Sequence, residues 1–242
     1  MVSGQVTSHD LESGRVRVGL YTAVYGNYET PRPIRVHSQV PCVMFTDSDV
    51  VAEKAIAVGW EARVIPHYIT TLKGDPKVVG PMLAHKWWKT HPHRALPGVN
   101  VSLWIDGSME VTVGDYVQRC LDALGDDDWA CVPHPARNCI YPEATFSATL
   151  ARYDTVSLLT QVAFYRDTVG HPHNWGLVAT GANVRRHTPS VIELSEQWWD
   201  ECVNWSHQDQ LSLPVLFRLS EGKVKWNRNI PWHQWWHLHQ HG

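Results

Sequence analysis

The sequence lacks the patterns that mark membrane and secreted proteins. None of its apolar runs approaches the length of about 18 residues that a membrane-spanning helix needs. Its first residues, Met1 to Gln5, form neither the basic nor the apolar part of a secretory signal peptide. We therefore expect a protein with no membrane span that resides in the cytoplasm.

Cysteine pairs and a basic surplus are also missing. The five cysteines are odd in number and contain no C-x-x-C pair, which favours buried thiols in a reducing compartment over disulfides or a zinc ribbon. The net charge of −3 gives no sign of a duplex-binding protein, although a local basic face leaves a nucleic acid open as an acceptor. The loop at 22–28 has one glycine instead of G-x-G-x-x-G, so the dinucleotide-binding fingerprint is absent.

The sequence does contain an alternation of strand and helix patterns. Apolar, β-branched segments predict strands, and apolar residues three and four apart predict helices. The predicted strands cover 15–21, 41–45, 60–65, 101–105, 129–132, 175–179 and 223–226, and the predicted helices cover 50–58, 81–89, 117–124, 156–163 and 191–205. This order predicts an α/β fold with a mostly parallel central sheet flanked by helices. We expect a single domain over 15–242, preceded by a flexible polar arm at 1–14.

The strand predicted at 101–105 ends in Asp106-Gly107-Ser108. Taken alone, this is a common Asp-Gly turn. In open α/β sheets, however, ligands bind beyond the carboxyl ends of the strands, where Gly107 would let the backbone turn sharply or approach a ligand. We expect the same place to receive the residues that end the first two strands, Thr22, Ala23, Tyr25 and Asp47.

A site without a glycine-rich phosphate loop must neutralise a bound diphosphate in another way. A divalent metal held by one or two carboxylates, with lysine or arginine nearby, would do so. Asp106 is the candidate metal ligand. The basic residues that can pair with phosphate or carboxylate groups are Lys86, Lys89, Arg137, Arg185 and Arg186.

Five segments, in this order, resemble a known family. They are 89–93, 102–108, 134–144, 180–187 and 209–212, and they are similar to domain-of-unknown-function family 616, which includes plant pectin and mucilage glycosyltransferase-like proteins. The resemblance runs from residue 17 to residue 236. It implies a glycosyltransferase-A fold, a nucleoside diphosphate-sugar donor such as a UDP-sugar, a saccharide or other hydroxyl acceptor, and Mn²⁺ or Mg²⁺ as cofactor. It also divides the domain into a nucleotide-binding half at 15–111 and a donor-sugar and acceptor half at 112–242.

The resemblance assigns a metal and diphosphate site to the end of the central strand. Such folds carry an Asp-x-Asp motif there, but here the second acid is replaced. Asp106 and Ser108 are therefore the expected ligands, with water or a C-terminal histidine, His237, completing the shell. His233 and His237 are four residues apart and would share one face of a helix.

Further residues gain roles from the same resemblance. Asp47 corresponds to a contact with the base or ribose, and Asp209-Gln210 to a pair that faces the donor sugar. Gln208 stands where this family often has arginine. Further donor contacts are implied for Lys86, Gly107, Arg137, Gly181 and Arg185.

These assignments predict sugar transfer in which charge stabilises the leaving diphosphate, and the plant resemblance favours retention of the anomeric configuration. Asp209 would steady the oxocarbenium-like centre or position the acceptor, unless it only caps a helix. Glu143 and His134 would contact the acceptor or act as a base, unless they only cap a turn. Two other functions stay open: a carbohydrate-binding protein that stacks its 13 tryptophans on sugar, and a metal-assisted hydrolase.

Overall fold

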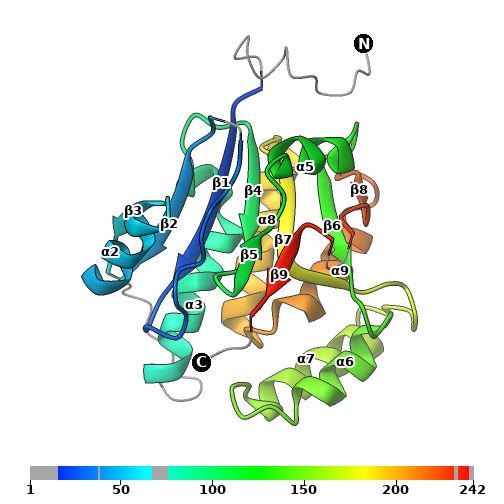
Figure 1. The fold of residues 1–242 in the computed structure, drawn as a ribbon. Coiled ribbons are helices and arrows are strands. Elements are labelled where there is room, and N and C mark those ends of the chain that lie inside the picture. The colour runs from blue at the N-terminus through cyan, green and yellow to red at the C-terminus, as the bar shows by residue number, and fades with distance from the viewer. Residues whose placement is uncertain (1–15, 38, 67–75, 232–233, 240–242) are drawn as a thin grey trace.

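A seven-stranded sheet forms the centre of the computed structural model, which describes residues 16–37, 39–66, 76–231 and 234–239 (Figure 1). Across the sheet the strands follow the order β3 (Glu61–Val64), β2 (Cys42–Thr46), β1 (Val18–Val24), β4 (Val101–Ile105), β7 (Val178–Arg186), β6 (Trp129–Pro133) and β8 (Trp226–Asn227).

The strand directions confirm the predicted fold class. β3, β2, β1 and β4 are parallel to one another, and β8 is parallel to β6. Among the described strands of this sheet, β7 alone is reversed, and it pairs antiparallel with both β4 and β6. β1 and β4 are buried along their whole length, as expected for apolar strands covered on both faces.

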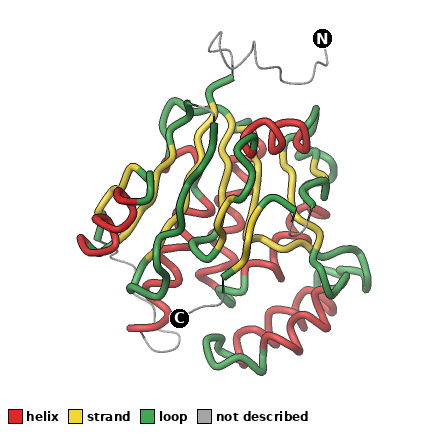
Figure 2. The backbone as a smooth tube through the Cα atoms, viewed as in Figure 1, coloured by secondary structure: helices red, strands yellow, loops and turns green. Residues whose placement is uncertain are grey.

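Helices cover both faces of the sheet (Figures 1 and 2). α3 (Pro76–Thr90), α4 (Pro92–Ala95), α8 (Pro189–Asn204) and α9 (Asp209–Leu219) pack on one face, and α2 (Asp49–Ala57) and α5 (Tyr116–Leu124) pack on the other. α6 (Ile140–Ser147) and α7 (Thr155–Asp167) form a separate pair that packs against Leu211 and Val215 of α9.

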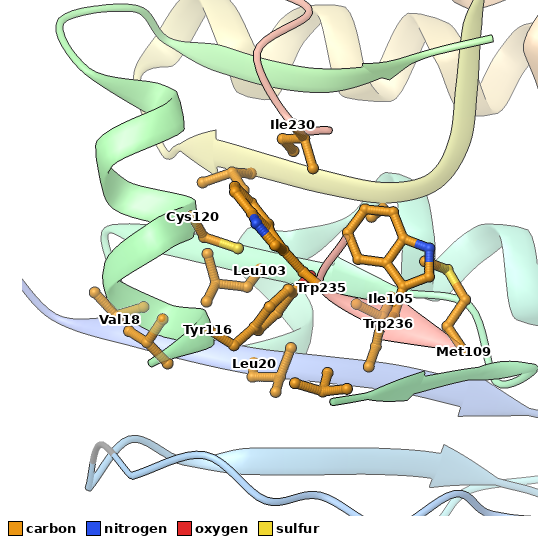
Figure 3. Packing of buried hydrophobic residues seen from close by; sticks show 14 of the residues in the cluster. Val18, Leu20, Leu103, Ile105, Met109, Tyr116, Cys120, Ile230, Trp235 and Trp236 are labelled. Atoms are coloured by element: carbon orange, nitrogen blue, oxygen red, sulfur yellow. The ribbon is translucent and has the colours of Figure 1, made fainter. Parts of the chain in front are cut away.

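The C-terminal tail closes the core on the face that carries α5 (Figure 3). β9 (Trp236–Leu238) pairs antiparallel with β5 (Met109–Val111). The buried rings of Trp235 and Trp236 lie edge-on to Tyr116, at 6.2 and 6.5 Å between ring centroids. Because burying a large apolar side chain stabilises a fold by about 1.5–3 kcal/mol, this packing holds the tail as a strand. The helix expected to carry His237 is therefore wrong, and His233 lies outside the described residues.

All five predicted helices are present. Those at 50–58, 81–89, 117–124, 156–163 and 191–205 correspond to α2, α3, α5, α7 and α8, and α3 begins before the predicted start. The sequence did not indicate α6, because Pro142 obscured the pattern; a proline in the first helical turn is tolerated, since the N–H that it lacks has no partner there.

Both predicted halves, 15–111 and 112–242, add strands to the central sheet, and the arm predicted at 1–14 lies outside the described residues. β7 begins where the expected strand at 175–179 ends. None of the helices in the described ranges combines the length and apolar character needed to cross a bilayer.

Candidate active site

Asp106 directly follows β4, at the edge of the sheet where the parallel strands end. Its backbone N–H donates to the carbonyl of Gly181 (2.8 Å), and its Oδ1 accepts the indole N–H of Trp104 (2.8 Å). The Asp106 side chain is 28% exposed, whereas Trp104 is fully buried. Pairing with β7 and the buried indole therefore fix a carboxylate that solvent can reach.

Asp209 is the first residue of α9 and is 2% exposed. Its Oδ1 accepts the hydroxyl of Thr180 (2.9 Å), and its Oδ2 accepts Lys86 Nζ (2.7 Å) and Lys89 Nζ (2.9 Å). Gln208 occupies the N-cap position of the helix. The alternative that Asp209 is only a capping acid is therefore wrong.

A buried lysine joins the two carboxylates. Lys89 Nζ lies 3.0 Å from Asp106 Oδ1 and 2.9 Å from Asp209 Oδ2, and its side chain is 0% exposed. Lys86, one turn earlier on α3, is 12% exposed and contacts Asp209. Residues three apart lie on the same side of a helix. α3 thus presents both ammonium groups to the acids.

Arg185 holds Lys89 in place by donating a hydrogen bond to the backbone carbonyl of Lys89. The Lys89 carbonyl accepts Arg185 Nη2 (2.6 Å) and the Tyr21 hydroxyl (3.3 Å), and Arg185 also donates to Tyr21 (2.7 Å). The guanidinium of Arg185 is fully buried and lies over the ring of Trp129. Arg185 thus ties the end of α3 to the sheet, in a position that gives a diphosphate no direct access to it.

Burial and neighbouring charges shift the pKa values of the two acids in opposite directions. Burial raises the pKa of Asp209, but the ammonium groups of Lys86 and Lys89 outweigh burial, and the pKa lies well below its usual range. The pKa of Asp106 is lowered in the same way, with Lys89 as its strongest partner. Burial lowers the pKa of His85 to about 3, so this ring, 3.6 Å from Asp106 Oδ1, is neutral. Two ionised acids and two ammonium groups therefore form a balanced cluster.

The groups around the Asp106 carboxylate are hydrogen-bond donors, which suit a free carboxylate better than one that binds a metal ion. Its Oδ1 faces the Trp104 N–H and the Lys89 ammonium, both of which are hydrogen-bond donors. Mn²⁺ and Mg²⁺ require several oxygen or nitrogen ligands at once. In the described ranges, no three His, Cys, Asp or Glu side chains are grouped to hold an ion.

The other two residues expected to bind the metal belong to the β5–β9 ladder. His237 is exposed opposite Glu110, which pairs with His239 Nε2 (2.9 Å). Ser108 is buried, and its carbonyl accepts the His239 N–H (2.9 Å). The residues present do not fit a resident divalent ion, and a metal held by Asp106, Ser108 and His237 stays a prediction.

Of the predicted nucleotide contacts, Thr22 and Ala23 lie within β1 instead of in a loop after it, whereas Tyr25 directly follows β1 and Asp47 follows β2. The Tyr25 hydroxyl accepts the Trp88 indole N–H (2.7 Å) and donates to the Ile65 carbonyl (3.0 Å). Both oxygens of Asp47 accept the Gly26 N–H (3.1 and 3.2 Å). Asp47 is partly exposed, whereas the remaining two predicted contacts, Thr22 and Ala23, are buried.

Two glycines leave space that any side chain would fill. A Cβ at Gly107 would lie 2.7 Å from Val24 Cγ2, so the turn after Asp106 packs directly on β1. A Cβ at Gly181 would lie 3.4 Å from Asp106 Oδ2. Glycine at both positions therefore lets the backbone lie close to Asp106 and leaves Asp106 Oδ2 uncovered.

Glu143 belongs to a neighbouring network instead of the lysine cluster. Its Oε2 pairs with Arg137 and lies 3.5 Å from His134 Nε2. Its Oε1 accepts Ser147 Oγ and Gln208 Nε2, each at 3.2 Å. Because Gln208 precedes Asp209, this network supports the start of α9. Gln210 is half-buried on the next position of the same helix.

The sequence did not assign Thr180, His85 or the bridging role of Lys89. The position of Lys86 and Lys89 on either side of Trp87 and Trp88 was a usable signal, since two lysines on one helix side beside such rings need acidic partners. Thr180 and His85 carried no comparable signal.

Comparison with known proteins places this geometry in a family. A family model described as "TOD1/MUCI70, glycosyltransferase-like domain" matches residues 6–233. A curated relative from Arabidopsis thaliana, described as "Probable hexosyltransferase MUCI70", is 27% identical over 143 residues, which cover 55% of this chain and 24% of the relative. The match thus spans about a quarter of that relative's length.

A solved structure of a glycosyltransferase shares the fold. The WbbM bifunctional glycosyltransferase in its apo form has a TM-score of 0.51 at 11% identity, with 83% of this chain and 37% of that chain covered. Mouse xyloside xylosyltransferase 1, also apo, has a TM-score of 0.47 at 9% identity, with 88% and 84% covered. Because the family model spans nearly the whole sequence, the chain belongs to the TOD1/MUCI70 glycosyltransferase-like domain family.

Proposed function

We propose that this chain transfers a sugar from a nucleoside diphosphate-sugar, with a UDP-sugar as the first candidate, to a hydroxyl group of an acceptor. The observation that carries the proposal is the pair of ionised acids, Asp106 and Asp209, held by the buried ammonium of Lys89 where the parallel strands end. Ligands bind at this edge in open α/β sheets, and membership of a glycosyltransferase-like family supports sugar transfer as the reaction class.

The proposed roles follow from position and charge. The bond between the anomeric carbon and the diphosphate oxygen breaks, its electron pair leaves with the diphosphate, the acceptor oxygen adds to the carbon, and the proton of the acceptor hydroxyl passes to the leaving diphosphate. Lys86 is the more exposed ammonium and would face the leaving group, while Asp209 would stabilise positive charge on the sugar. Fixed charges lower the barrier because they need no reorientation as charge develops. We expect retention of the anomeric configuration, which proton NMR of the product tests.

The structure weighs against a protein that only binds carbohydrate. That alternative depends on tryptophan rings stacking on sugar, but no tryptophan is among the exposed large apolar residues of the described ranges, whose exposed aromatic rings are Tyr28, Phe146 and Phe164. Buried ion pairs also contribute little net stability, so a fold without chemistry gains little from this cluster. A balanced cluster at a ligand-binding edge is better explained by catalysis.

The test separates binding from chemistry. Calorimetry with UDP and other nucleoside diphosphates identifies the nucleotide, and release of that nucleotide from its sugar conjugates measures turnover. Asp209→Asn should bind the nucleotide as tightly as the parent and lose about a hundredfold or more in turnover. Asp200→Asn, an exposed change on α8, is the matched control. Undiminished turnover in Asp209→Asn would remove Asp209 from the mechanism.

A further inference from the structure

We infer that the two lysines of α3 take the place of a divalent cation at this site: Lys86 binds the diphosphate of the donor, and Lys89 holds the two acids in position. The inference rests on the proposed function and concerns the same site. Relatives with this fold are expected to have two carboxylates at this position, whereas this chain has one. The inference explains how such a chain can hold an anionic donor.

The carboxylate oxygens are already committed to these lysines. Asp209 Oδ2 contacts both ammonium groups, Asp209 Oδ1 accepts Thr180, and Asp106 Oδ1 contacts Lys89. Asp106 Oδ2 is left as the one oxygen of the two acids with no such contact in the described ranges. A divalent ion at Oδ2 would lie next to the ammonium on Oδ1, and like charges at that range repel strongly in a buried site. The geometry therefore favours the lysines as the cation.

The two lysines differ in what they can do. Lys89 is completely buried and touches both acids, so moving it would leave Asp106 without its ammonium partner and Asp209 with Lys86 alone. If Lys86 turns away from Asp209, that acid keeps Lys89 and Thr180. Lys86 is also the partly exposed member of the pair, on a flexible four-carbon stem. Lys86 is thus free to move toward an entering diphosphate, while Lys89 holds the acids in place.

The experiment measures binding, so it does not depend on the acceptor. Calorimetry is run with UDP, GDP, ADP and CDP, once in excess EDTA and once in millimolar Mn²⁺ or Mg²⁺. We expect at least one nucleotide to bind with a Kd that differs by less than about threefold between the two buffers. Lys86→Met should weaken that binding about 10- to 100-fold, the effect of one charge-assisted contact. Lys86→Arg should restore most of it.

A control variant and a folding test accompany the experiment, and three results would count against the inference. Lys54→Met removes an exposed lysine from α2 and should leave binding unchanged, and thermal unfolding should show that Lys86→Met is folded. A Kd that improves by about tenfold or more when metal is added would overturn the inference and leave the proposed function standing. Unaltered binding by Lys86→Met in EDTA would do the same. If no nucleotide binds in either buffer, the proposed function fails and the inference fails with it.

Discussion

Replacement of Lys89 by methionine is the most direct test of the bridge between the acids. Methionine keeps the length of the side chain and removes its charge, so Asp106 and Asp209 lose the cation that lies 3.0 and 2.9 Å away. Lys86 still contacts Asp209, but Asp106 has no second ammonium within ion-pair distance in the described residues. We expect a large loss of folding free energy.

The magnitude follows from the contact distances. Two unit charges 3 Å apart attract by roughly 5 kcal/mol at an effective dielectric constant of about 20. Part of this is offset by the cost of removing the charges from water, and loss of one partner from a buried pair typically costs about 3–5 kcal/mol. The same range applies here, because Lys89 is fully buried. It is a large part of the roughly 5–15 kcal/mol that stabilises a typical domain.

Urea unfolding at neutral pH, followed by tryptophan fluorescence, measures this loss. Adding Asp106→Asn to Lys89→Met removes the carboxylate that has lost its ammonium, so the double variant should be more stable than the sum of the single changes by about 1–3 kcal/mol. Lys54→Met, on the exposed side of α2, is the control and should change stability by less than about 0.5 kcal/mol. A cost below about 1 kcal/mol for Lys89→Met would refute the view that Lys89 holds the acids together.

Three further outcomes are expected. Burial lowers the pKa of His85 to about 3, against about 6.5 in an unfolded chain, so the unfolded state binds its proton first and stability falls as the pH drops below 6.5. Between pH 7 and pH 5 the loss from this residue is about 2 kcal/mol in urea titrations, and His85→Gln should flatten the pH dependence; an unchanged slope would contradict the assignment. Glu143→Gln should cost about 1–3 kcal/mol through its weakened contact with Arg137 and keep turnover within about tenfold, whereas a loss above about a thousandfold in a folded variant would make Glu143 a base. Gly107→Ala places a methyl group 2.7 Å from Val24 and should cost about 1–3 kcal/mol in the same assay, and a neutral result would show that the turn relaxes freely.

The strand pattern around Asp106 could be predicted because it is local. Apolar residues at 101–105 followed by Asp-Gly indicate a strand end, and both the strand and the accessible acid are present. The family resemblance correctly drew attention to the segments that contain Thr180 and Asp209. The parallel order of the first four strands also follows from the alternation of strands and helices.

Features that depend on distant contacts could not be predicted. The reversal of β7 is set by its pairing with β4 and β6, and nothing in its own nine residues specifies a direction. From the sequence alone, Arg185 is a candidate phosphate ligand. Its position on a buried strand instead turns its side chain toward Tyr21 and the Lys89 carbonyl. The conformation at His237 is likewise set by the pairing of its strand with β5. The four-residue spacing of the histidines, which suggested a helix, does not determine it.

The acid and the lysines of this site are also far apart along the chain. Lys89 and Asp209 are separated by 120 residues, and Lys86 and Asp209 by 123. Contacts across such long loops form late in folding, because closing the loop costs entropy before any contact repays it. The ion pairs that both lysines make with Asp209 therefore require that α9 has docked. A chain growing from its N-terminus carries Asp106 and both lysines early, but it gains the complete binding site only when its final segments have been made.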